Sequence, residues 1–220
     1  MDPALILASG SLRRRDLLSA LRLAFAVEPA DVDESMLAGE APEALVERLS
    51  RTKGQAVARR HPSAWVLAAD TIGVLDGRVL GKPSGPADAI EMLRALRGRM
   101  HLVHTAVTVV HVDQATTSCC TSRVWMREYS DAEIERYVAT GDPLDKAAAY
   151  AIQHPTFAPV ARWEGCYASI MGLPLGMAAR LLAGAGLPAL GDVASACEAA
   201  SGVVARCAGR CCLRDAAAGC

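Results

Sequence analysis

The sequence predicts an α/β fold in which helices cover a sheet. Short apolar runs typical of strands alternate along the chain with segments whose apolar residues recur at helical spacing. No internal repeat interrupts this alternation. Hydrophobic residues make up 52% of the 220 residues, which is enough to bury a sizeable core. We therefore expect one compact unit or two closely fused lobes.

The first predicted elements are a strand, a tight loop and a helix. The aliphatic run 4–8 ends in a Ser-Gly-Ser loop at 9–11, and leucines recur at helical spacing over 13–23. Backbone N–H groups at a helix start and arginine side chains both favour phosphate, so this segment can form a phosphate cradle. A capped helix with a solvated basic face explains the segment equally well. Because the three arginines at 13–15 are consecutive, at most two can face one ligand.

A second helix is expected from Pro42 to about Arg60. A proline is tolerated in the first turn of a helix, and the apolar positions 45, 46, 49, 56 and 57 form one face. This helix carries Lys53.

The following strand contains the most unusual residue of the chain. Residues 65–75 have a buried-strand pattern that is interrupted by Asp70, and a buried carboxylate is costly unless it is paired, hydrogen-bonded or bound to a metal. The Asp-Gly pair after this strand predicts a two-residue hairpin turn into 78–80. Nearby Lys82 favours a functional site over an Asp that caps a turn at Thr71. A solvated surface lysine remains the alternative for Lys82.

The remaining clear elements are two helices and two strands. Apolar spacing marks a helix over 90–96 that a following glycine can close with a left-handed cap. Strands are expected at 102–112 and, with weaker alternation, at 117–127. The sequence at 130–133 has the spacing of a capping box for a helix that ends before Gly141.

A polar segment follows this last helix. The side chains of Asp142, Asp145 and Lys146 lie in a short loop, where they can clasp a base, a ribose or a metal. They can instead pair with one another at the surface. Gln153 follows a nearly apolar stretch, and a buried glutamine needs partners for both ends of its amide. The edge of a base and a structural hydrogen bond satisfy this need equally well.

Two further groups of residues were considered as metal ligands. An acidic cluster at Asp31, Asp33 and Glu34 can bind a hard cation through carboxylate oxygens, although solvated loop acids are the commoner explanation. The histidines follow no recognised metal spacing and are expected to pack or to lie at the surface; they include His101, His104 and His111.

The composition changes near the C-terminus. Ala, Gly and Cys dominate with little period, so we divide the chain into a domain at 1–185 and a tail or added helix at 186–220. Five of the eight cysteines lie in the last two dozen residues, but their spacing is not that of a usual zinc site. Without a secretion signal, they are expected to be thiols in a reducing compartment.

Charge and hydropathy point away from several classes of protein. The net charge is −1, with 23 basic and 24 acidic residues, so nothing indicates a nucleic-acid or membrane surface. The N-terminal apolar run is too short for a signal peptide, and no stretch approaches the roughly 18 apolar residues of a membrane span. We expect a cytoplasmic protein that binds neither nucleic acid nor membrane.

Four segments together resemble the Maf family of nucleotide pyrophosphatases in order and spacing. They are LILASGSLRRRDLL, AADTIGVLDGRVLGKP, YVATGDPLDKAAAYAIQ and EGCYASIMGLPL, within residues 4–180. The resemblance implies an α/β fold similar to that of inosine triphosphatases. It has a long mixed sheet, flanking helices and two lobes around a nucleotide cleft, and is often found in a homodimer. Leu12 stands where the family usually has proline, and we expect a modest effect because no contact is lost.

The resemblance also implies roles for individual residues. Asp70 resembles the family's catalytic carboxylate, which acts as general base or holds the Mg²⁺ or Mn²⁺ that activates water, and Glu34 is implied as a second metal ligand. The implied triphosphate contacts are Ser9, Arg13, Arg14, Lys53 and Lys82. The residues implied in substrate choice are Arg13, Thr71 and Gln153, with Asp145 and Lys146 matching the pattern of the subfamily that acts on dTTP and UTP.

The resemblance therefore implies hydrolysis of dTTP, UTP and modified uridine triphosphates to the monophosphate and pyrophosphate. Such an activity would clear aberrant nucleotides, and the family is also linked with arrest of septum formation. Two alternatives stay open. A non-catalytic regulator of septum formation would bind a nucleotide without turnover, and a purine-type enzyme would prefer inosine or xanthosine triphosphate. A general phosphatase lacks support, because the chain has no phosphate-accepting nucleophile motif.

Overall fold

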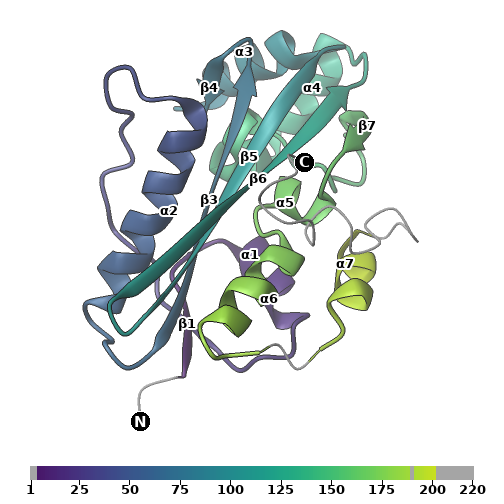
Figure 1. Cartoon of the computed structure of the whole chain (residues 1–220). Helices are drawn as coiled ribbons and strands as arrows, with labels where there is room; N and C mark the ends of the chain where they lie inside the picture. Colours follow the sequence, from purple (N-terminus) through teal and green to yellow (C-terminus); the bar gives the residue numbers. More distant parts are fainter. Residues whose placement is uncertain (1–3, 189–190, 202–220) are drawn as a thin grey trace.

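The computed structural model describes residues 4–188 and 191–201. Strands and helices alternate over most of this length, as predicted (Figure 1). The elements in chain order are β1 (Leu5–Leu7), α1 (Leu12–Ser19), β2 (Ala26–Val27), α2 (Pro42–Ala58), β3 (Trp65–Leu75), β4 (Arg78–Leu80), α3 (Pro86–Leu96), β5 (Met100–His111), β6 (Gln114–Met126), α4 (Asp131–Ala139), the 3-10 helices η1 (Asp142–Asp145) and η2 (Ala147–Ala149), β7 (Val160–Glu164), α5 (Tyr167–Met171), α6 (Leu175–Gly184) and α7 (Val193–Ser201).

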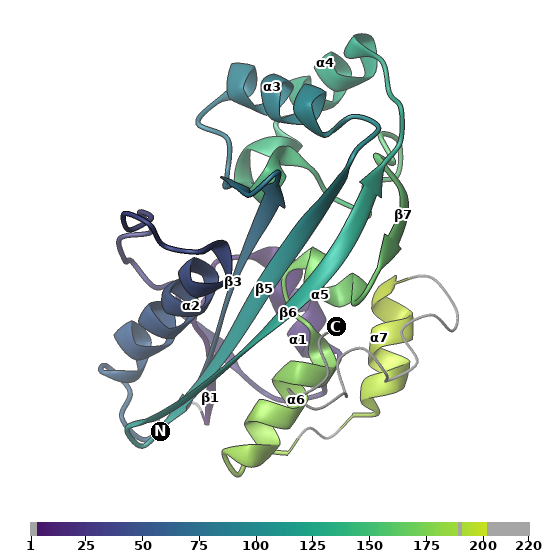
Figure 2. The ribbon, with the colours of Figure 1, turned by 45° about the horizontal axis from the view of Figure 1, so that its top comes forward.

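The sheet is mixed, which confirms the predicted fold class. Within the described residues it has seven strands in the order β2-β1-β3-β5-β6-β7, with β4 paired to β3 outside this path. Strand β1 lies parallel to both β2 and β3. All the other strand pairs are antiparallel. The long strands β3, β5 and β6 cross the whole molecule (Figure 2).

One edge of β3 is interrupted. Strand β1 pairs with residues 65–67 of β3, and β4 pairs with residues 73–75. Over residues 68–72, no strand in the described part of the chain pairs with β3 on that side. Asp70 and Thr71 lie in this gap, and because successive side chains of a strand point to opposite faces, the gap is accessible to groups from both faces of the sheet.

Helices cover both faces and one end of the sheet. Helix α2 packs on β3, β5 and β6, while α6 packs on the same strands from the opposite face, beside α1 and α5 (Figures 1 and 2). Helices α3 and α4 pack on each other across the upper end. Alternation along β3 explains the two faces, because Val66 and Ala68 belong to a core cluster with α2, whereas Leu67 and Ala69 pack toward α1 and α6.

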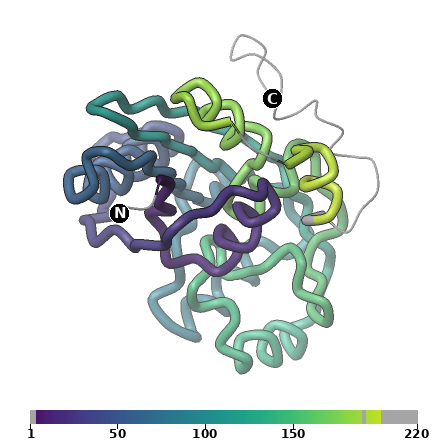
Figure 3. Tube along the Cα trace, turned by 90° about the horizontal axis from the view of Figure 1, so that it is seen from below, coloured from purple at the N-terminus to yellow at the C-terminus, as the bar shows by residue number. Residues whose placement is uncertain are grey.

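Helix α7 lies within the segment that the sequence separated as a tail or added helix. Its residues Ala196 and Cys197 are buried in the same cluster as Leu17 and Leu21, and Gly191 donates a hydrogen bond to the carbonyl of Leu21. The view from below shows α7 (yellow) beside the N-terminal segment (purple) (Figure 3). The other four cysteines of that segment, and the expectations about them, lie outside the described residues. No helix in the described ranges is long and apolar enough to cross a bilayer.

The local signals in the sequence identified several elements correctly. Strand β3 spans 65–75 as expected, and both Asp76 and Gly77 have the positive φ that a two-residue hairpin turn needs. The capping box before α4 is present, with the Ser130 hydroxyl accepting from the Glu133 N–H and the Glu133 carboxylate accepting from the Ser130 N–H.

Other boundaries differ from the prediction. Helix α1 ends at Ser19 instead of residue 23, and Arg22 then adopts a positive φ. Gly98 has a positive φ but donates to the carbonyl of Arg127, so it does not close α3 with a cap. Strand β6 begins at Gln114 because the tight turn before it is made by Val112 and Asp113, and a valine at positive φ gives no turn signal in a sequence.

The three histidines of β5 are packing residues. His101 and His104 are each 1% exposed, and His111 stacks on Trp65 with ring centroids 4.0 Å apart. His101 Nε2 lies 2.9 Å from the Tyr150 hydroxyl, and its Nδ1 has no hydrogen-bond partner among the described residues. Burial lowers the pKa of His101 from 6.5 to about 4.

We expect His101 to make the fold acid-sensitive. Because its folded-state pKa is lower than its unfolded one, its contribution to stability is complete above pH 6.5 and is lost as the pH falls toward about 4. The free energy of unfolding should fall by roughly 3 kcal/mol across this window. Urea denaturation at a series of pH values measures this change, and a His101→Gln variant with the same pH dependence as the wild type would contradict it.

Candidate functional site

A cavity of about 680 Å³ opens at the interrupted edge of β3. It lies within the range of small-molecule sites, roughly 300–1,000 Å³. All of the residues predicted for the site line it, although they come from segments spread over most of the chain: Ser9, Arg13, Arg14, Glu34, Lys53, Asp70, Thr71, Lys82, Asp145, Lys146 and Gln153.

Asp70 faces α2 and is paired there with Lys53. The distance between Lys53 Nζ and Asp70 Oδ1 is 2.6 Å, and both side chains are at most 10% exposed. Asp70 lies in the middle of β3, so the alternative that it caps a turn at the end of a strand is wrong. A buried carboxylate that is held by one ammonium at a cavity wall is a candidate functional group.

Glu34 shares the same ammonium from the other side. It belongs to the loop between β2 and α2, and its Oε1 lies 2.9 Å from Lys53 Nζ. Partial burial opposes ionisation of Glu34, but the hydrogen bond and charge of Lys53, together with the charges of Lys82 and Arg14, outweigh it and lower its pKa. Asp31 and Asp33 do not line the cavity, so only one member of the acidic cluster reaches the site.

Arg14 reaches the opposite face of β3 from α1. Its guanidinium donates to the Ser9 hydroxyl at 3.2 Å, to the Thr71 hydroxyl at 3.1 Å and to the carbonyl of Gly172 at 2.9 Å. All three acceptors are neutral. Burial lowers the pKa of Arg14, but an arginine stays protonated at ordinary pH. Arg13 also lines the cavity, whereas Arg15 is exposed, consistent with at most two of the arginines facing one side.

Gly172 is a site residue that the sequence reasoning did not select. It ends α5 with φ 114°, a conformation that favours glycine, and a Cβ at this position would lie 3.3 Å from Arg14 Nε. The glycine after a short helix is a visible signal for such a cap. Its contact with Arg14 spans 158 residues, however, and no local pattern indicates that contact.

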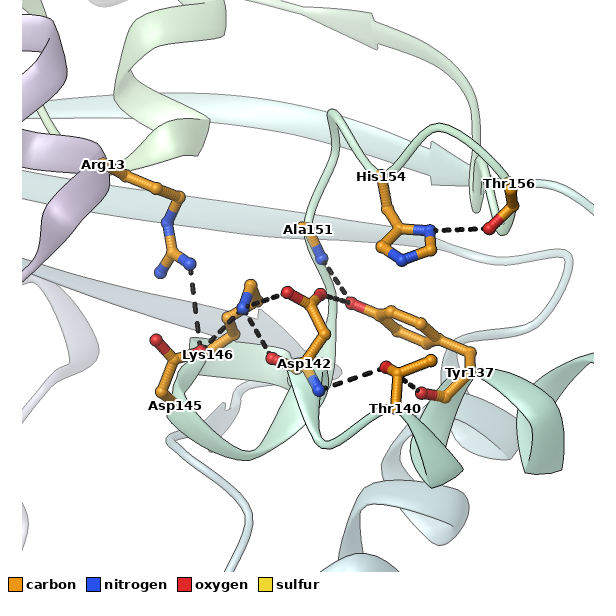
Figure 4. Close-up of polar contacts among 9 residues, drawn as sticks. All are labelled: Arg13, Tyr137, Thr140, Asp142, Asp145, Lys146, Ala151, His154 and Thr156. Carbon is orange, nitrogen blue, oxygen red and sulfur yellow. Dashed lines mark hydrogen bonds and ion pairs between the residues drawn. The ribbon is translucent and has the colours of Figure 1, made fainter.

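The segment after α4 forms a further wall of the cavity (Figure 4). Asp145 carries two cations, with Lys146 Nζ at 2.7 Å and Arg13 Nη1 at 3.9 Å. The predicted pairing among Asp142, Asp145 and Lys146 is thus present, although Lys146 is buried rather than at the surface. Gln153 lines the cavity but is exposed, so the expectation of a buried glutamine is wrong.

Lys82 differs from the other lysines of the cavity. It is exposed, and no hydrogen bond or ion pair holds its ammonium among residues 4–188 and 191–201. Lys82 can therefore pair with an anion without breaking an existing contact.

Only two carboxylates of the described site could serve as ligands of one metal ion. Glu34 and Asp70 both contact Lys53, and no group of three or more His, Cys, Asp or Glu side chains within the described residues could hold a metal. Mg²⁺ commonly binds through one or two carboxylates together with phosphate oxygens of a substrate. The residues thus fit a cation that arrives with a phosphorylated ligand.

The chain is similar to a family of known proteins and to individual relatives. The family model described as Maf-like protein matches residues 4–185. A dTTP/UTP pyrophosphatase from Thermomicrobium roseum is 46% identical over 185 residues, which cover 84% of this chain and 85% of that protein. A dTTP/UTP pyrophosphatase from Myxococcus xanthus is 49% identical over 184 residues, which cover 84% of this chain and 93% of that protein.

A solved structure shows a weaker similarity. The Ham1 protein of Staphylococcus aureus is 17% identical, and the match covers 56% of this chain and 71% of that chain with a TM-score of 0.41. This degree of similarity does not establish a shared fold.

We expect Lys53→Met to destabilise the protein. The change leaves the carboxylate of Asp70 buried without its cation, which should lower the free energy of unfolding by roughly 3 kcal/mol in urea denaturation. Adding Asp70→Asn removes the uncompensated charge and should recover much of the loss. Lys82→Met is the matched control, because its ammonium is exposed and unpaired within the described residues, and it should change stability little. A double variant no more stable than Lys53→Met would contradict this account.

Proposed function

The chain belongs to the Maf family, and on that premise we propose that it is a nucleoside triphosphate pyrophosphatase acting on dTTP, UTP and modified uridine triphosphates. The observation that carries the proposal is the convergence of all the predicted site residues on one cavity. The names of the two bacterial relatives support the choice of pyrimidine nucleotides.

The distribution of charge supports a triphosphate as ligand. Arg13, Arg14, Lys53 and Lys82 surround the part of the cavity next to the gap in β3. A nucleoside triphosphate carries several negative charges, and hydrolysis at the α-phosphorus makes pyrophosphate the leaving group. Cationic side chains near that group stabilise the charge that develops on it. We assign these four side chains, with Ser9, to the triphosphate.

Asp70 is assigned to the attacking water. The oxygen of a water molecule bonds to the α-phosphorus while the bond from that phosphorus to the bridging oxygen breaks, and the electron pair of this bond leaves with pyrophosphate. The carboxylate of Asp70 accepts the proton that the water releases. Lys53, at 2.6 Å, keeps this carboxylate ionised and oriented until the nucleotide binds.

A divalent cation is the cofactor that we propose. Glu34 and Asp70 would hold Mg²⁺ or Mn²⁺ together with phosphate oxygens, since the site offers too few protein ligands to hold it alone. When bound, the cation supplies positive charge to the phosphates and lowers the pKa of water.

The base is assigned to the wall formed by the segment after α4. The exposed amide of Gln153 offers both a donor and an acceptor, which suits the imide edge of uracil or thymine. Thr71 and Arg13 complete the proposed selectivity set.

The proposal predicts pyrophosphate release from dTTP and UTP. The full chain is assayed with Mg²⁺ or Mn²⁺ and with dTTP, UTP, CTP, 7-methyl-GTP and inosine triphosphate, and the nucleotide product is identified. Faster release from dTTP and UTP, with the monophosphate as co-product and loss of activity after chelation, is the expected result. Preference for inosine triphosphate would favour the purine-type alternative, and binding without release would favour the regulator.

Asp70→Asn provides the internal control of this assay. The variant should fold, because Lys53 keeps Glu34 as a partner, while turnover should fall at least about a hundredfold. Asp76→Asn is the matched control with the same chemical change in the exposed turn after β3, and it should stay active. An active Asp70→Asn enzyme would remove Asp70 from the assigned role.

A further inference from the structure

Lys146 lines the cavity, yet its ammonium is fully occupied by the protein. A lysine has three N–H donors, and those of Lys146 are matched by three acceptors. These are the backbone carbonyl of Asp142 at 2.5 Å, the Asp142 carboxylate at 2.8 Å and the Asp145 carboxylate at 2.7 Å (Figure 4). The side chain of Lys146 is 7% exposed. A phosphate or a base could gain this ammonium only by breaking one of these contacts.

Tyr137 of α4 connects this cluster to the next part of the cavity wall. Its hydroxyl donates to the second carboxylate oxygen of Asp142 at 2.7 Å and accepts a hydrogen bond from the backbone N–H of Ala151 at 3.0 Å (Figure 4). The ring is held independently of the hydroxyl, since it stacks on Phe157 with centroids 4.4 Å apart. The hydroxyl thus joins two points of one segment, before and after the residues that line the cavity.

The backbone between these points is strained. Ala148 and Ala149 have φ values of 59° and 58°, in the left-handed region that costs a residue other than glycine free energy. Such a conformation persists only where several contacts fix it. The Ala148 N–H donates to the carbonyl of Gly81, and a Cβ added to Gly73 would lie 2.8 Å from that of Ala148, so β3 lies directly beneath the segment.

We propose that Tyr137, Asp142 and Lys146 are positioning residues that hold residues 147–153 in the strained form that faces the nucleotide. Lys146 acts through Asp142 and Asp145 and does not touch the nucleotide. The inference rests on the proposed function for its kinetic consequence, because residues 147–153 form the wall assigned to the base. It differs from the role of Lys146 implied by the family resemblance, which was a substrate contact.

The chain offers a matched control for Tyr137. Tyr129 and Tyr137 are each 3% exposed, belong to the same core cluster and pack on Phe157. The Tyr129 hydroxyl donates to the carbonyl of Leu93 in α3, away from the cavity. Replacing either tyrosine by phenylalanine deletes one buried hydroxyl, so the two variants differ only in which contact is lost.

The experiment compares Tyr137→Phe and Tyr129→Phe in the full chain by steady-state kinetics with UTP and by amide hydrogen exchange. We expect Tyr137→Phe to raise KM about five- to tenfold with kcat nearly unchanged, because the lost hydrogen bonds orient the base and not the reacting phosphorus. Amides in 147–153 should exchange faster in this variant only. Tyr129→Phe should keep the wild-type KM and the wild-type exchange of 147–153.

A third variant tests how Lys146 acts. If Lys146 works through the same contacts as Tyr137, the effect on KM of Tyr137→Phe with Lys146→Met should be clearly smaller than the product of the two single effects. A full product of the two effects would show an independent contact of Lys146 with the nucleotide and would overturn its assignment. A fall in kcat at constant KM in Tyr137→Phe, or equal behaviour of the two tyrosine variants, would overturn the whole inference.

Hydrogen exchange separates this inference from the proposed function. If the wild type turns over none of the nucleotides, the proposed function fails, but faster exchange of 147–153 in Tyr137→Phe alone would still support the positioning network. Unchanged exchange in that variant would overturn the network whatever the activity.

Discussion

The interrupted edge of β3 is the constraint on which the site depends. A strand that is paired along both edges offers only its two faces, and these are covered by α2 on one side and by α1, α5 and α6 on the other. Because β1 ends at its pairing with Leu67 and β4 begins at Gly73, residues 68–72 are open at the edge. Side chains that belong to opposite faces, Asp70 and Thr71, therefore line one cavity.

The cations of the cavity fall into two groups according to their partners. Lys53 and Lys146 are each bonded to two carboxylates, so their charge is compensated within the protein. Arg14 bonds to neutral oxygens, and Lys82 has no ion pair in the described part of the chain. The uncompensated positive potential thus comes mainly from Arg14 and Lys82, and this potential attracts an anionic ligand in a chain whose net charge is only −1.

Features that depend on local chemistry could be predicted from the sequence, and features that depend on distant contacts could not. The hairpin at Asp76-Gly77 and the capping box at Ser130 are fixed by a few neighbouring residues. An aspartate within an apolar strand indicated the site because burying a charge requires a partner. The identity of that partner, the gap beside it and the contact of Arg14 with Gly172 arise from strand pairing and packing over long separations, which no periodicity records.

The packing of α7 separates the family's sequence region from the physical folding unit. The region shared with the Maf family ends at residue 185, yet Ala196 and Cys197, both beyond it, complete the hydrophobic cluster that also contains Leu18 and Leu182. A chain cut where the shared region ends would present part of that cluster to water, with the aggregation risk of any newly exposed apolar patch. Boundaries drawn by homology and boundaries drawn by burial therefore disagree in this protein, and an expression fragment should follow the second.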